Sequence, residues 1–167
     1  MPEMPYASVQ DMIERFGEVE LVQLTDPDQR AVQPQRAQRA LDDAQAFANG
    51  LLAQAYRLPL AGCTKPAPTP QNPRATVQAP PPQLVRIVCD VARYYLYDEL
   101  APEHEVALRY KAASAELRAI ADGRAQLTCP WGGTPGEALT SGALGDGQVY
   151  SHFSPRQVTD EAAGSYR

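Results

Sequence analysis

The sequence predicts a mainly α-helical protein: a small bundle of about four helices with a Pro-rich extended loop and a long extended C-terminal arm. Apolar residues recur at helical spacing within the first 127 residues. Seven of the nineteen residues 64–82 are proline, which excludes a long helix or a central strand there. Eighteen of the forty residues 128–167 are Gly, Pro, Ser or Thr. We therefore predict a helical domain over residues 1–127 and an extended arm over residues 128–167.

The first helix is expected to follow Ser8, because Ser8 and Asp11 have the spacing of a capping box. Gly17 is a natural helix terminator. A second short turn is expected over residues 19–24, before the breaker sequence at residues 25–28.

The clearest helix covers residues 34–56, which contain no internal proline and carry an alanine-rich apolar stripe. Pro82 suits the first turn of a further helix. That helix is apolar on most sides, so it is expected to be the buried centre of the bundle. A last helix is expected from Pro102 to a stop at Gly123.

Residues 58–82 form the Pro-rich connector, for which we predict a short strand pair near its ends. Such a long loop inside a compact domain is often functional.

Composition restricts the function. The net charge is −5 and the isoelectric point is near 5.0, which disfavours a protein whose main task is to grip phosphates. Cys63, Cys89 and Cys129 are far apart and are expected to be reduced thiols, with Cys89 a small core residue. Too few suitable ligands stand at paired spacings for a zinc site, so no metal and no cofactor are expected. The N-terminus does not resemble a signal peptide, and synthesis in the cytoplasm is expected.

No catalytic site is expected. Ser151, His152 and Asp160 could be assembled into a triad only on paper, because they lie in the arm without an elbow motif or an oxyanion-hole signature. An acidic cluster around a helix junction is better explained as a solvated cap that favours the helix dipole; it comprises Asp98, Glu99, Glu103 and Glu105.

Two further groups have alternative interpretations. Arg86 and Arg93 share a helix face and could bind an anionic ligand, although ion pairs at the edge of the core are the commoner arrangement. Three tyrosines, Tyr94, Tyr95 and Tyr97, could stack on bases, but core packing or a protein interface is preferred.

Several stretches in this order resemble a family of small proteins from Mu-like phages and prophages, encoded among the head and neck genes. They are residues 6–17, 21–26, 41–44, 48–52, 56–60, 82–84 and 90–97, with residues 153–156 similar to the family's usual finish. The resemblance implies kinship with neck adaptors, small helical subunits that form a twelve-fold ring beneath the portal protein and pass the DNA channel on to the stopper and tail.

The resemblance therefore implies a structural protein of the virion neck, made in the host cytoplasm. Its expected partners are the portal protein, the stopper or tail-terminator proteins and further copies of itself, with DNA passing through unbound. A stopper or tail-completion protein of the same neck is the first alternative, and a small phage regulatory protein is the second.

The extended segments are the expected contact regions, since large side chains dominate interface energetics. In the arm the candidates are Trp131, Val149, Tyr150, Phe153, Pro155 and Arg156. In the loop they are Pro66, Pro68, Pro70 and Pro73.

Overall fold

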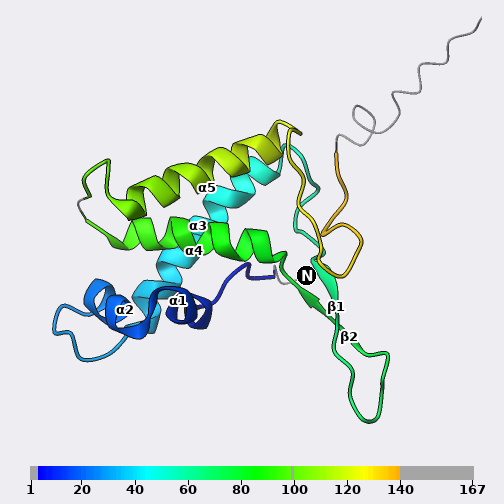
Figure 1. The fold of residues 1–167 in the computed structure, drawn as a ribbon, viewed down its shortest axis with the longest axis horizontal. Helices are drawn as coiled ribbons and strands as arrows, with labels where there is room; N and C mark the ends of the chain where they lie inside the picture. The colour runs from blue at the N-terminus through cyan, green and yellow to red at the C-terminus, as the bar shows by residue number, and fades with distance from the viewer. Residues whose placement is uncertain (1–3, 99, 140–167) are drawn as a thin grey trace, which may run out of the picture.

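The protein is mainly helical, as the computed structural model shows for residues 4–98 and 100–139 (Figure 1). Within these residues there are five helices and one two-stranded sheet. Their bounds are α1 Val9–Phe16, α2 Glu18–Thr25, α3 Pro34–Leu52, β1 Cys63–Pro66, β2 Thr76–Ala79, α4 Pro82–Leu96 and α5 Glu105–Ala121.

Local signals set the ends of the short helices α1 and α2. The Asp11 N–H donates to Ser8 Oγ at 3.2 Å, and the Ser8 N–H donates to the Asp11 carboxylate at 2.7 Å, so the predicted capping box is confirmed. Gly17 has φ of +89°, a value that suits glycine, and it separates α1 from α2. The expected turn at residues 19–24 is thus part of a helix.

Helix α4 is the centre of the bundle, as its sequence predicted. It packs against α3 and α5, while α1 and α2 lie together against α3 and α4 (Figure 1). Its buried residues are Leu84, Ile87, Val88, Cys89, Asp90, Val91, Ala92 and Leu96. The alanines of α3 are buried at Ala37, Ala40, Ala44 and Ala48, which lets neighbouring helices approach closely.

A partly buried ion pair joins α2 to α4. Arg93 donates two hydrogen bonds to Glu20, at 2.6 and 2.9 Å, and its guanidinium lies 4.5 Å from the centre of the Phe16 ring. The Tyr97 hydroxyl donates to the same carboxylate at 3.0 Å. Burial disfavours the charged guanidinium, but the hydrogen bonds and charge of Glu20 outweigh it and raise the pKa of Arg93.

Helix α3 ends at Leu52, four residues before the predicted end at Tyr56. Tyr56 instead forms an isolated antiparallel bridge with Ala138, and its buried hydroxyl accepts a hydrogen bond from the Leu127 N–H at 3.0 Å. Contacts with a segment more than seventy residues away therefore override the helical pattern at this end.

Candidate interaction surface

The Pro-rich connector forms a β-hairpin that projects from the end of the helical body (Figure 1). Strands β1 and β2 are antiparallel, with Cys63 opposite Ala79 and Pro66 opposite Thr76. The predicted strand pair is therefore confirmed. Only Cys63 of the eight strand residues is buried, so the hairpin is a projection and not part of the core.

The tip of the hairpin is a structured turn. The Thr69 N–H donates to the Asn72 carbonyl at 3.0 Å, and the Asn72 N–H donates to the Thr69 hydroxyl at 3.0 Å. The Asn72 side chain then accepts from the Arg74 N–H at 3.1 Å. The last two of these three bonds use short polar side chains to hold the backbone, as is common in turns.

The structure brings the predicted loop residues together on this hairpin. Pro66 ends β1, and the turn presents the others; all four, Pro66, Pro68, Pro70 and Pro73, are exposed. Exposed prolines provide apolar contact area whose backbone needs little further ordering.

The base of the hairpin is tightly packed at Gly62. Its φ is +83°, and a Cβ at this position would lie 2.8 Å from Met4 Cε and 3.0 Å from the Ala79 carbonyl oxygen. The Gly62 N–H donates to the Pro135 carbonyl at 2.8 Å. Glycine is therefore required where the N-terminus, the hairpin and residues 128–139 meet.

The expectation of three reduced thiols is wrong for two of them. Cys63 in β1 and Cys129 form a disulfide across 66 positions of sequence. The sequence has no signal for this pairing, because only the folding of the chain places the two residues side by side. Cys89 is free and buried, as expected, and burial raises the pKa of its thiol to about 12.

The described part of the predicted arm, residues 128–139, lies against the body and the hairpin. The Arg57 N–H donates to the Glu137 carbonyl at 2.9 Å, and the Leu139 N–H donates to the Ala55 carbonyl at 2.8 Å. Val149, Tyr150, Phe153, Pro155 and Arg156 lie outside the described residues, as do Ser151, His152 and Asp160. The arm boundary at residue 127 stays a prediction.

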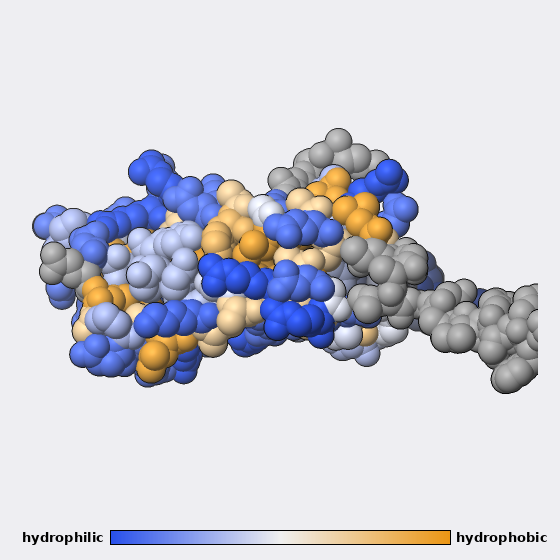
Figure 2. Space-filling model, turned by 90° about the horizontal axis from the view of Figure 1, so that it is seen from above, coloured by the Kyte–Doolittle hydropathy of each residue, from blue (hydrophilic) through white to orange (hydrophobic). Residues whose placement is uncertain are grey.

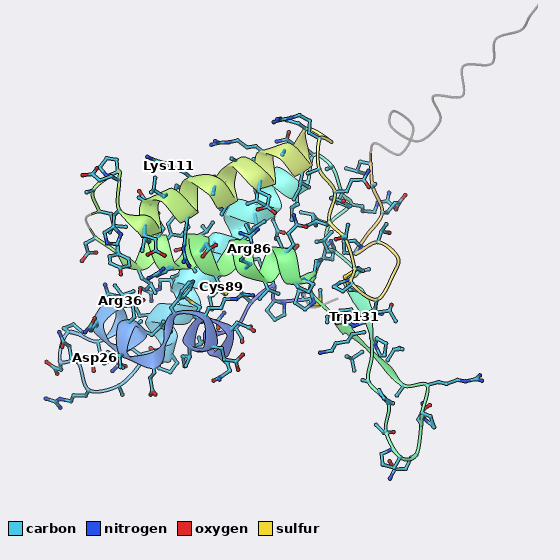
Figure 3. All side chains as sticks on the ribbon, viewed as in Figure 1. Asp26, Arg36, Arg86, Cys89, Lys111 and Trp131 are labelled. Carbon is cyan, nitrogen blue, oxygen red and sulfur yellow. A yellow bond between two sulfur atoms is a disulfide. The ribbon has the colours of Figure 1, made fainter. Side chains whose placement is uncertain are left out.

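Trp131 is the one predicted arm residue that the structure describes. It lies beside the base of the hairpin (Figure 3) and is 40% exposed. The Lys65 ammonium of β1 lies 5.5 Å from the centre of its ring, a cation–π contact. The neighbouring disulfide at Cys129 ties this segment to β1. Trp131 and Lys65 thus present one composite surface.

The excess of basic residues around the hairpin could have been found in the sequence, but the prolines alone were used to identify this segment. Residues 44–89 contain four basic residues, Arg57, Lys65, Arg74 and Arg86, and no acidic residue, in a chain whose net charge is −5. Within the described residues, neither Lys65 nor Arg74 has an ion-pair partner. The hairpin is therefore a positively charged projection on an acidic protein.

The two arginines of α4 make ion pairs rather than an open anion site. Arg86 contacts Glu116 at 2.6 Å and Asp90 at 3.7 Å, and Arg93 contacts Glu20. Burial opposes ionisation of Glu116, but hydrogen bonds from Gln83 and Arg86 give a net lowering of its pKa. The commoner interpretation of this arginine pair is confirmed.

The tyrosine group is part of an aromatic contact between helices. Tyr94 stacks on Tyr110 of α5 with ring centres 4.1 Å apart, and Phe47 of α3 lies next to Tyr110. Tyr95 is 38% exposed beside them. Packing therefore accounts for Tyr94, and Tyr97 is bonded to Glu20.

The acidic residues at the start of α5 lie on the surface. Asp98, Glu103 and Glu105 are exposed, and Glu105 pairs with Arg109 one turn later; Glu99 is outside the described residues. Across the described ranges, no group of three or more His, Cys, Asp or Glu side chains could hold a metal ion. In the same ranges, no helix combines the length and apolar character needed to span a membrane.

Comparison with known proteins places this small helical protein among the proteins of Mu-like phages. The chain matches, over residues 6–143, the model of the family described as "Bacteriophage Mu, Gp36", and it belongs to that family. It is also 32% identical over 123 residues to "Gene product J" of Escherichia phage Mu, across 72% of this chain and 74% of that protein. The expected similarity to Mu-like phage proteins is thereby confirmed.

Proposed function

We propose that the protein is a structural component of the phage neck: an adaptor subunit that forms a ring, joins the portal protein to the stopper and tail, and borders the DNA channel. In this proposal the protein is not an enzyme and needs no cofactor. It is made in the host cytoplasm and becomes part of the virion. The twelve-fold symmetry comes from the resemblance alone and is part of the proposal.

The observation that carries the proposal is a helical body from which an ordered hairpin projects. An adaptor must hold its shape while it reaches neighbouring proteins. The buried core of α3, α4 and α5 supplies the rigid part. The hairpin, whose base is fixed by the Cys63–Cys129 disulfide, supplies the reaching part. An isolated two-stranded hairpin is marginally stable in water, so this anchoring supports a role for it.

The negative net charge also supports a protein that borders the DNA channel. A net charge of −5 disfavours tight binding to the DNA backbone, so DNA would pass without being held. Membership of a phage Mu family is consistent with a particle protein.

The test is negative-stain microscopy of lysates from a phage that lacks this gene, beside the same phage complemented with the wild-type gene. Separate accumulation of full heads and free tails is expected in the deletion, with virions restored by complementation. Intact virions in normal numbers from the deletion would overturn the neck proposal.

A second strain distinguishes an adaptor from a stopper or tail-completion protein. This strain lacks both this gene and the gene of the next neck protein, and it is supplied with a tagged copy of this protein. An adaptor is expected to remain on purified heads there, whereas a tail-completion protein would be found with the tails. A regulatory protein would be recovered with neither.

A further inference from the structure

We propose that the positively charged hairpin of one copy docks in the groove along α2 of a second copy, so that the contact is head to tail. This inference rests on the proposed function, because it assigns the two surfaces that join neighbouring subunits of the ring. It follows from the charges, the exposed apolar groups and the positions of the two surfaces.

The two surfaces carry opposite charge. The hairpin, residues 63–79, holds the two basic residues Lys65 and Arg74 and no acidic residue, a net charge of +2. Helix α2, residues 18–25, holds the two acidic residues Glu18 and Glu20 and no basic residue, a net charge of −2. Complementary charge of this kind steers association and sets its register.

The groove along α2 has the shape and the groups to receive the hairpin tip. It has a volume of about 330 Å³ and is lined by Glu18, Val19, Val22, Gln23, Gln29 and Arg30. Val19 is 73% exposed, so its side chain is open to contact from another molecule. Glu18 has no ion-pair partner among the described residues, whereas Arg30 is already paired with Asp28 at 3.6 Å.

The hairpin tip offers the matching groups. The exposed prolines Pro68, Pro70 and Pro73 supply apolar surface for Val19 and Val22. Arg74, which has no ion-pair partner in the described part of the chain, supplies the cation for Glu18. Arginine is well suited to such a carboxylate because its planar guanidinium can form two parallel hydrogen bonds.

The position of the surfaces excludes contact within one copy. The hairpin and α2 lie at opposite ends of the long dimension of the molecule (Figure 1). A contact between two different surfaces of identical chains is heterologous, and it produces a closed ring when the rotation between copies closes. The occupant of the α2 groove is therefore a second copy.

The test is sedimentation velocity of the purified full-length chain up to about 1 mM at low salt, where surface charges are least screened. The single variants R74E and E18R are expected to lower the association constant at least about ten-fold each. The double variant E18R/R74E is expected to recover the wild-type constant to within about three-fold. An equimolar mixture of the two single variants should associate more strongly than either variant alone, because it restores one Arg74–Glu18 pair per contact between unlike copies.

R118E is the matched control, because Arg118 is exposed on α5 and its replacement changes the net charge as R74E does. It is expected to associate like the wild type. Circular dichroism confirms that each variant is folded.

Three results would overturn the inference. They are a wild-type chain that stays monomeric at about 1 mM, single variants that associate normally, and a double variant that is not restored. A salt-dependent DNA shift that R74E abolishes, with self-association unchanged, would instead assign the hairpin to nucleic acid. None of these results tests the neck proposal, which the lysates of the deletion phage test separately. Restored association in the double variant beside normal virions from the deletion phage would sink the neck proposal alone.

Discussion

Replacing Arg93 by methionine should destabilise the protein strongly, because it leaves the Glu20 carboxylate partly buried without its cation. The side chains are 13% and 23% exposed, and two hydrogen bonds join them. Breaking a fully buried pair costs about 3–5 kcal/mol. Because Glu20 keeps some solvent and the Tyr97 hydroxyl, we expect a loss of about 2–4 kcal/mol of unfolding free energy. That is a large share of the roughly 5–15 kcal/mol that stabilises a typical domain.

The chain contains a matched control in the exposed pair between Arg57 and Glu137, which lie 3.1 Å apart. These side chains are 72% and 67% exposed, so solvent screens the pair. The variant R57M should therefore change the stability by less than about 0.5 kcal/mol.

Urea unfolding followed by circular dichroism measures both effects. At about 2–4 °C per kcal/mol for a chain of this size, R93M should also lower Tm by about 4–16 °C. A double-mutant cycle with E20Q isolates the coupling, expected at about 1–3 kcal/mol. Equal losses for R93M and R57M, or a coupling energy near zero, would refute the reasoning that burial decides the strength of these pairs.

Three further predictions follow from the described contacts. Backbone hydrogen bonds from Arg30 and Asp28 lower the pKa of Asp26. The ionised carboxylate therefore stabilises the fold, and this stabilisation is lost as the pH falls through the lowered pKa. The variant D26N should be less stable than the wild type at pH 7, and its stability should depend less on pH in the acid range. Burial raises the pKa of Asp90, so the ionised carboxylate disfavours folding at pH values above that pKa. The variant D90N should therefore be at least as stable as the wild type at pH 7. The difference in stability between the two should shrink as the pH is lowered. The cross-link between residues 63 and 129 should contribute about 4 kcal/mol by restricting the unfolded chain, so a dithiol reductant should lower the Tm of the wild type but not of C63S/C129S.

These predictions have separate points of failure. The two aspartates are both less than 10% exposed, so variants that behave alike over pH 3–8 would show that hydrogen bonding does not distinguish them. An equal reductant effect on the wild type and C63S/C129S would place the effect elsewhere in the protein.

The helices were the most predictable part of the fold, because their signals are local. The Ser8 capping box, the glycine at position 17 and the proline at position 82 each act within about one turn. The apolar surface of residues 84–96 was enough to predict a buried central helix. The prolines of residues 64–82 predicted an extended connector, and the strand pair expected near its ends is present as β1 and β2.

The candidate surface was only half predictable. The prolines identified the projecting segment, but the tip turn and the Lys65–Trp131 contact needed the structure. The opposite charges of the hairpin and of α2 can be counted in the sequence, but their location at opposite ends of the molecule cannot. On the face drawn in Figure 2, apolar residues form small separate patches among polar side chains.

The sequence by itself determined the number and order of the main helices, which of them is central, and that a proline-rich segment interrupts the bundle. Only the tertiary structure decided the partners across long separations: Glu20 with Arg93, Cys63 with Cys129, and Tyr56 with Ala138. The physical reason is range. A cap or a helical stripe depends on residues three or four positions away, whereas a partner 66 or more positions away depends on how every helix between them packs and turns the chain.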